Sequence, residues 1–139
     1  MRRSRSLPEE QRSSKVEANI PASDLQRARS YYADNLGLTP SAEYEGMLMY
    51  QTAGGTAFSI YETQYAGMAG HTIAQWHVDD IEAEVSDLKA NGVVFEVYED
   101  MPGVEWNGEI ASIPTMGQAA WFKDSEGNTM CLDQGLPAN

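Results

Sequence analysis

The pattern of hydrophobic and polar residues changes character abruptly near the middle of the chain. Residues 72–78, which read Thr-Ile-Ala-Gln-Trp-His-Val, alternate in size and polarity, as in a strand whose two faces meet different surroundings. An acidic pair follows, and then Ile81, Val85 and Leu88 recur at helical spacing. This stretch therefore predicts a strand that runs into an amphipathic helix.

The same transition occurs earlier in the chain. When Asp24 is aligned with Asp80, Leu25 falls on Ile81. The other equivalent pairs are Glu17 with Ile73 and Asn19 with Gln75. We interpret the chain as two copies of one βαβββ module, at about residues 15–62 and 72–134, joined by a connection over residues 63–71.

The first module opens with a predicted strand over residues 15–20, which Pro21 should close because proline lacks a backbone donor. Ser23 and Gln26 form a capping-box pattern that predicts a helix from Asp24. Its apolar stripe is Leu25, Ala28, Tyr32 and Leu36, and Gly37 ends it. Strands are predicted at residues 39–44, 47–52 and 56–62.

In the second module, Asp79 and Glu82 form a D-x-x-E pattern that predicts the helix start, and Asn91 with Gly92 ends the helix. Residues 93–98 predict a strand that is rich in β-branched and aromatic side chains. Residues 100–117 are loop-rich, with one short strand expected near Ile110. Strands at residues 118–123 and 129–133 then predict a hairpin.

Length and composition favour one α+β domain over residues 15–139. At 139 residues the chain can bury a core without disulfides, and its single cysteine, Cys131, allows no intrachain bridge. Residues 1–14 are polar and basic, so we expect a disordered tail. No apolar run approaches the roughly 20 residues of a membrane-spanning helix, and no signal peptide is recognisable, so cytoplasm is the expected location.

The charge is distributed unevenly. Residues 1–15 sum to +3, and the formal total of −12 leaves −15 for residues 16–139. Such a field repels phosphate, which argues against a nucleic-acid partner and against an anionic membrane surface. It attracts small cations, although solubility alone is the plainer explanation for an acidic chain.

Several short motifs, in their order and spacing, resemble the vicinal oxygen chelate superfamily, which includes glyoxalase I, extradiol dioxygenases and the bleomycin-resistance proteins. They are Ile-Pro-Ala-Ser-Asp-Leu at 20–25, Arg-Ser-Tyr-Tyr at 29–32, Asn-Leu-Gly-Leu at 35–38, Val-Asp-Asp-Ile at 78–81, Asn-Gly-Val at 91–93 and Phe-Lys-Asp-Ser-Glu-Gly-Asn at 122–128. The family writes the last motif F-x-D-P-D-G-N, so Ser125 and Glu126 depart from it. The resemblance covers about residues 16–133.

The resemblance implies two βαβββ modules that form a cup and, in metal-dependent members, a ligand from the first and the last strand of each module. Carried onto this chain, those four positions are Glu17, Ser59, Ile73 and Cys131. Isoleucine has no lone pair and a serine hydroxyl is a weak ligand, whereas a divalent ion needs three or four imidazole or carboxylate groups. We therefore expect no family-type metal and no cofactor, with a divalent metal as the alternative.

Strand alternation predicts which other side chains line the cup. If Ile73 points inward, Gln75 and His77 do as well, while Ala74 and Trp76 lie beneath the helices. The same parity turns inward Asn19, Ser59, Tyr61, Cys131 and Asp133. If Phe122 packs under a helix, Trp121 turns to the cup, and Trp106 lies in the loop-rich segment that covers its mouth. Together they make the mixture of apolar walls and polar groups typical of a small-molecule pocket.

Three of these residues can carry chemistry, and each has a plainer interpretation. Glu17 in a closed cup can act as a general base, or it is a strand carboxylate paired with Lys15. His77 can serve as an acid or base, or it hydrogen-bonds locally at a strand end. Cys131 can be a nucleophile, or it is a buried inert thiol. Trp106 and Trp121 can stack a planar ligand or pack in a core or interface.

The sequence thus supports two hypotheses of different class. The first is a metal-free protein that binds a small, aromatic or cationic molecule in the cup. The second is an enzyme, a lyase, isomerase or dioxygenase, that uses Glu17 and His77 with an unusual metal site. A purely interaction role with a vestigial pocket is a third alternative. Analogy with the family also predicts a homodimer.

Overall fold

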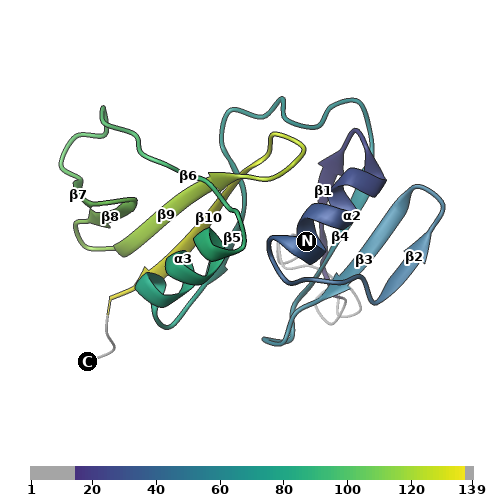
Figure 1. Cartoon of the computed structure of the whole chain (residues 1–139), viewed down its shortest axis with the longest axis horizontal. Helices are drawn as coiled ribbons and strands as arrows, with labels where there is room; N and C mark the ends of the chain where they lie inside the picture. The colour runs from purple at the N-terminus through teal and green to yellow at the C-terminus, as the bar shows by residue number, and fades with distance from the viewer. Residues whose placement is uncertain (1–14, 137–139) are drawn as a thin grey trace, which may run out of the picture.

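The computed structural model describes residues 15–136 as two modules joined by a linker (Figure 1). Module 1 consists of β1 (Ala18–Ala22), α2 (Leu25–Asp34), β2 (Ala42–Tyr44), β3 (Met47–Gln51) and β4 (Ala57–Glu62). Module 2 consists of β5 (Thr72–His77), α3 (Ile81–Ala90), β6 (Phe95–Glu96), β7 (Glu105–Asn107), β8 (Ile110–Ile113), β9 (Gly117–Lys123) and β10 (Thr129–Gly135). The predicted α+β fold of two tandem βαβββ modules is confirmed. The predicted tail at residues 1–14 lies outside the described residues.

The two modules share one strand order. The first sheet runs β1-β4-β3-β2 and the second runs β5-β10-β9-β8-β7, with β6 also paired to β9. In each module the first strand pairs in parallel with the last strand. Asn19 lies opposite Ser59, as Gln75 lies opposite Cys131. The repeat found in the sequence therefore relates equivalent places in two copies of one structure.

Both helices begin one residue later than the capping patterns predict. Asp24 caps α2 and Asp80 caps α3, and each carboxylate accepts a hydrogen bond from the backbone N–H three residues on, at 3.0 and 3.1 Å. Aspartate at this position satisfies a donor that has no partner within the helix. Ser23 is not the cap because its N–H and hydroxyl both bond to Glu126. Asp79 likewise precedes the cap of α3.

Two predicted strands also differ from the structure. Strand β1 continues through Pro21 to Ala22, which the sheet tolerates because β1 is an edge strand and loses no ladder partner there. The strand predicted over residues 93–98 shrinks to Phe95–Glu96. The loop-rich segment holds the hairpin β7–β8 rather than one strand, because Gly108 (φ +63°) permits a two-residue turn.

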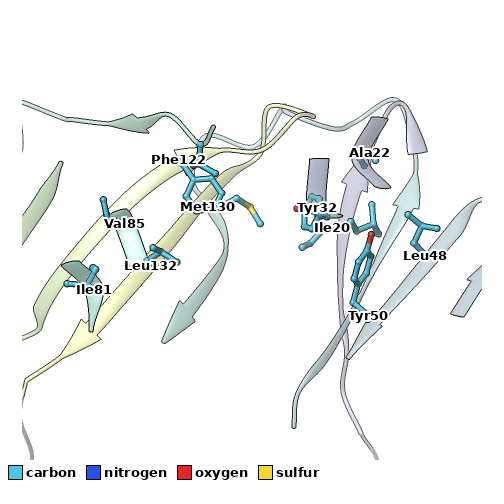
Figure 2. Close-up of a cluster of buried hydrophobic side chains, with 14 of the residues drawn as sticks. Ile20, Ala22, Tyr32, Leu48, Tyr50, Ile81, Val85, Phe122, Met130 and Leu132 are labelled. Carbon is cyan, nitrogen blue, oxygen red and sulfur yellow. The ribbon is translucent and has the colours of Figure 1, made fainter. Parts of the chain in front are cut away.

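The faces of the two sheets that carry the helices build one hydrophobic core (Figure 2). The predicted stripes are confirmed, with Leu25, Ala28 and Tyr32 of α2 buried, as are Ile81 and Val85 of α3. The two halves of the core meet where Phe58 contacts Trp76 edge to face, at 6.3 Å between ring centroids. The opposite face of each sheet is left free for other groups. Within residues 15–136, no helix is long and apolar enough to span a membrane.

The β9–β10 loop of module 2, residues 124–128, reaches across to module 1 (Figure 1). The Glu126 side chain is only 1% exposed and accepts hydrogen bonds from the N–H groups of Ser23 and Asp24, at 2.9 and 3.0 Å. Arg27 Nε donates to its other oxygen at 2.8 Å. A carboxylate is favourable at a helix N-terminus, where backbone donors and the helix dipole both point at it. Glu126, where the sequence departs from the family motif, therefore joins the modules.

Further polar contacts flank this carboxylate. Asn128 donates from Nδ2 to the Pro21 carbonyl at 2.8 Å, and the Tyr32 hydroxyl donates to Asp124 Oδ2 at 2.7 Å. Both Asn128 and Tyr32 are buried. We call residues 124–128 together with their partners on module 1 the inter-module clasp.

Candidate functional site

The sheet of module 2 presents its free face on the side away from α3, and we call this the module 2 face. Strand alternation sends Phe122, Met130 and Leu132 into the core and turns Trp121 and Cys131 to the opposite side. Trp121 lies opposite Cys131 in the β9–β10 ladder. The predicted turn of Trp121 toward the free face is therefore found in the structure.

Three polar side chains meet on this face at the edge formed by β5 and β10. Asp133 lies opposite His77 in the parallel ladder, and Oδ1 of Asp133 is 2.6 Å from Nδ1 of His77. Gln75 Nε2 donates to Asp133 Oδ2. The His77 side chain is 81% exposed, whereas that of Asp133 is 23% exposed. We call His77, Asp133 and Gln75 the polar triad.

Three aromatic rings form a wall beside the triad. The Trp121 ring contacts Tyr98 at 5.7 Å and Trp106 at 6.0 Å between centroids, both at tilted or edge-to-face angles. Such arrangements are favoured over face-to-face stacking by the ring quadrupoles. Burial raises the pKa of Tyr98 to about 12, and its hydroxyl donates to Glu96 at 2.6 Å. The wall is therefore a fixed apolar surface with its only hydroxyl already engaged.

Trp121 lines two hollows on the module 2 face. The first, of about 140 Å³, also contains Gln75, Cys131 and Asp133. Its other lining residues are Thr72, Ile113, Met116, Gly117, Gln118 and Ala119. The second, of about 370 Å³, is lined by Trp121 together with Tyr98, Lys123 and His71, among others. Apolar walls thus converge with a few polar groups, as in ligand pockets generally.

Cys131 lies at the base of the first hollow. It is buried, and its thiol is 3.2 Å from the Leu132 carbonyl oxygen. Burial, reinforced by the charge of Asp133, raises the pKa of the thiol to about 11. Because the thiolate is the nucleophile and the metal ligand, a thiol that stays protonated at neutral pH does neither well. The structure thus supports the inert alternative for Cys131.

The predicted residues of module 1 do not share these hollows. Glu17 precedes β1, is exposed, and lines a separate hollow of about 500 Å³ together with Lys15. Ser59 is buried on the free face of its sheet. Asn19 and Tyr61 lie beside it on the same face and are exposed.

The seam between the modules forms a further hollow, of about 660 Å³. Phe58 lines it from module 1, and Trp76, Gln75 and His77 line it from β5. Two members of the polar triad, Gln75 and His77, therefore border the seam as well as the module 2 face.

Ile73 needs a correction. The ladder between β5 and β10 shifts register there, because Thr72 pairs with Thr129 while Ala74 already pairs with Met130. A bulge of this kind changes the facing of the strand by one residue. Ile73 therefore packs partly against the core, and Thr72 lines both hollows in its place.

The four positions that the family resemblance assigns to a metal do not fit a divalent ion. Glu17 and Cys131 line different hollows, Ile73 has no donor atom, and the Cys131 thiol is protonated at neutral pH. Within residues 15–136, no group of three or more His, Cys, Asp or Glu side chains converges as a metal site would require. The donor set offers no basis for chemistry through a metal.

Asp133 and Thr72 belong to the site, although the sequence did not single them out as ligand-binding. Alternation with Cys131 already turned Asp133 inward, but its pairing with His77 depends on the β5–β10 register. Thr72 depends on the bulge, which leaves no sequence signature here. The places of Asp133 and Thr72 in the site are therefore determined by strand pairing rather than by local sequence.

Comparison with solved structures finds folds similar to this one. TnmS3, an antibiotic binding protein from Streptomyces sp. CB03234, is 22% identical with a TM-score of 0.65, over 88% of this chain and 97% of that one. A bleomycin-binding protein complexed with bleomycin is 17% identical with a TM-score of 0.66, over 89% and 100%. The fosfomycin resistance protein FosX from Listeria monocytogenes, complexed with Mn(II) and sulfate, is 15% identical with a TM-score of 0.61, over 89% and 91%.

No curated protein matches the chain by sequence. The family model described as Glyoxalase/Bleomycin resistance protein/Dioxygenase superfamily matches residues 16–132, nearly the whole described chain. The duplicated βαβββ topology agrees with that match. The chain therefore belongs to the glyoxalase/bleomycin resistance protein/dioxygenase superfamily.

Proposed function

We propose that this protein binds a small aromatic molecule on the module 2 face and does so without a metal. The observation that carries the proposal is the arrangement around Trp121, which lines two hollows and contacts two further aromatic rings. A planar ligand beside such a wall buries apolar area on a rigid surface, which costs little conformational entropy. Gln75 and Asp133 of the polar triad line the first hollow and supply the few orienting groups that a binding pocket needs.

The proteins with similar folds include two that are described as binding a small molecule and one that is complexed with a metal ion. Two of the three are described as binding an antibiotic or bleomycin, and the third as a resistance protein complexed with Mn(II). Fold likeness at such low identity does not decide between them. The donor set does favour binding without a metal, because the base of the hollow here is a protonated thiol rather than a group of imidazoles and carboxylates.

Metal analysis tests the metal-free part of the proposal. Protein purified without chelators is expected to carry far less than one Fe, Mn, Ni or Zn per chain by inductively coupled plasma mass spectrometry. Treatment with a chelator is expected to leave the melting temperature unchanged. One metal ion per chain, lost on chelation together with stability, would overturn it.

A ligand screen tests the binding part. Thermal shift is measured against planar antibiotics, cationic antibiotics and dicarbonyl–thiol adducts. Stabilisation follows RT ln(1 + [L]/Kd), so a ligand at about 100 times its Kd adds roughly 2.7 kcal/mol to the free energy of unfolding. Stabilisation by the adducts alone, with turnover of the adduct, would favour an enzyme.

The contact between His77 and Asp133 favours a second candidate, an enzyme in which His77 is a general base. A carboxylate that holds Nδ1 leaves Nε2 to accept a proton, as in other histidine bases. Glu17, the other candidate base, lines the separate hollow beside Lys15. Any turnover should then fall at least about 100-fold in His77→Ala. An unchanged rate in that variant would remove this candidate.

We also propose that the protein is a homodimer. The support is family analogy, together with apolar side chains left in solvent near the free faces, among them Met116 at 69% exposure and Tyr61 at 39%. Covering such side chains in a second copy removes apolar area from water. Sedimentation velocity at micromolar concentration should give about twice the 15.3 kDa chain mass, and a monomer would refute this part.

A further inference from the structure

The polar triad fixes which hydrogen-bonding groups the module 2 face presents to a ligand. The Asp133 carboxylate has only acceptor oxygens, so the short contact to His77 Nδ1 requires that this nitrogen carry the hydrogen. In the neutral imidazole the other nitrogen, Nε2, then has no hydrogen and is an acceptor. The side chain is 81% exposed, so Nε2 is open to a ligand. Asp133 therefore sets the tautomer of His77.

Gln75 presents the same polarity for the same reason. Its Nε2 amide group donates to the second oxygen of Asp133. The amide plane then turns Oε1 away from Asp133, and that oxygen is again an acceptor. Gln75 lines the hollow beside Trp121 and also lines the seam between the modules. Asp133 thus orients two neighbours so that both offer acceptors.

The distance from this acceptor end to the aromatic wall follows from the ladder. Trp121 lies opposite Cys131, and Cys131 lies opposite Gln75, so two strand spacings separate the ring from the amide. At about 4.8 Å a spacing, the two side chains stand roughly 10 Å apart across the face. Gln75 and Trp121 line the same hollow, so one ligand can contact both.

Charges elsewhere on the module 2 face also favour a cationic ligand over an anionic one. Lys123 lines the second hollow together with Trp121, and its Nζ lies 3.4 Å from Glu96. The positive charge at that end is therefore already compensated. The chain as a whole carries −12, which raises the local concentration of cations.

From this geometry we propose that the module 2 face binds an aromatic molecule that carries an alkylamine arm. Its ring packs on Trp121, and the amine, on an arm about 10 Å long, donates to the acceptors of His77 and Gln75. A ligand with a carboxylate or phosphate beside His77 and Gln75 is excluded, because their acceptor atoms and the charge of Asp133 repel an anion. The inference rests on the proposed function and names the ligand of the same site.

Three fluorescent probes that differ only at the end of one arm test this inference. Dansylcadaverine carries an ammonium and dansyl-6-aminohexanoate a carboxylate, whereas N-pentyl dansylamide has only a hydrogen at the end of the same five-carbon arm. Dissociation constants are measured by fluorescence with the full chain in roughly 0.3 M salt, which screens charges beyond about 6 Å. The ammonium probe is expected to bind at least about 10-fold more tightly than the pentyl probe and more tightly still than the carboxylate probe.

Two variants connect that preference to the triad. His77→Ala removes an exposed side chain, so the fold should be unaffected, and Asp133→Asn replaces the carboxylate that orients both neighbours. Each is expected to reduce the preference of the ammonium over the pentyl probe to within about 3-fold while the pentyl probe binds as before. Trp121→Ala is expected to weaken all three probes together.

The outcomes separate the two proposals. If all three probes bind equally and depend on Trp121, the binding function stands and the acceptor-end inference is overturned. A preference for the carboxylate probe, or an ammonium preference that survives in both triad variants, overturns it as well. If no probe binds, or if Trp121→Ala changes none of them, the binding site itself is wrong.

Discussion

The two modules of this protein have one backbone plan and different chemistry on their free faces. Equivalent positions follow from the ladders, because from Ala18 in β1 and Ala74 in β5 onward each first strand pairs with its last strand in the same register. From module 1 to module 2 the equivalent residues are Asn19 and Gln75, Pro21 and His77, Met49 and Trp121, Ser59 and Cys131, and Tyr61 and Asp133. The comparison shows that the two modules share one frame, while the paired polar side chains and the aromatic wall occur on the free face of module 2.

The difference is greatest at the ends of the paired strands. In module 1 this pair is Pro21 and Tyr61, of which Pro21 has no polar side-chain atom. In module 2 it is His77 and Asp133, whose contact gives a fixed acceptor. Module 2 also has the extra strands β6 and β7, and the segment that holds them supplies Tyr98 and Trp106 to the aromatic wall. The free face of module 2 thus differs from that of module 1 both in single residues and in the added segment.

The largest expected effect comes from breaking the clasp that joins the two modules. Burial alone would raise the pKa of Glu126, but hydrogen bonds from Arg27, the Asp24 N–H and Ser125 outweigh it and lower the pKa from 4.5 to about 2. A lowered folded-state pKa contributes stability above the unfolded value, and that stability is lost as the pH falls through the folded value. Glu126→Gln should therefore reduce the free energy of unfolding at pH 7 by about 3 kcal/mol.

Chemical denaturation as a function of pH checks this. The difference in free energy of unfolding between wild type and Glu126→Gln should disappear as the pH falls from about 5 to about 2. This is the window between the unfolded and folded pKa values of Glu126. Asp24→Asn, which alters the neighbouring helix cap but leaves the clasp carboxylate, is the matched control and should cost well under about 1 kcal/mol, because asparagine caps a helix about as well as aspartate. A pH-independent difference would contradict the linkage.

The thiol at the base of the module 2 hollow gives the next test. With a pKa near 11, Cys131 is almost entirely protonated at pH 7.4, so we expect alkylation by iodoacetamide roughly 100-fold slower than for a free thiol. In denaturant the rate should become normal. Mass spectrometry of quenched samples gives both rates.

The same experiment can be placed in module 1. Ser59→Cys, made in a Cys131→Ser background, puts a thiol at the equivalent buried position, where Tyr61 stands in place of Asp133. Burial should slow its reaction as well, but less than for Cys131, since Tyr61 takes the place of the Asp133 carboxylate. Equal rates would show that Asp133 adds nothing to the shift.

The sequence predicted the frame of this protein better than its site. Helical stripes and the repeat that aligns Asp24 with Asp80 were enough for two βαβββ modules, because both are local patterns that recur in the chain. The parity of β9 also turned Trp121 to the free face. The bulge that withdraws Ile73 and the contact between His77 and Asp133 arise from pairing between β5 and β10, which lie at opposite ends of module 2. No local pattern encodes that register.

The aromatic wall can be tested against its equivalent in module 1. Trp121→Ala removes the central ring of the wall, whereas Met49→Ala changes the matching position of the other sheet. Dansylcadaverine should bind at least about 10-fold more weakly to the first variant, about 1.4 kcal/mol, and within about 2-fold of wild type to the second. Equal losses would mean that both faces contact the ligand.

The smallest effect is expected where the C-terminal ends of the two helices meet. Asn35 and Asn91 cap α2 and α3 at equivalent positions, and Asn35 Nδ2 donates to the Asn91 carbonyl at 2.8 Å. The bond uses one side chain and one backbone group, so the two residues are not interchangeable. Asn35→Ala should lower the free energy of unfolding by about 1 kcal/mol, and Asn91→Ala by less, because the carbonyl acceptor remains. Urea denaturation of both variants measures the difference, and a larger loss in Asn91→Ala would show that this contact does not couple the modules.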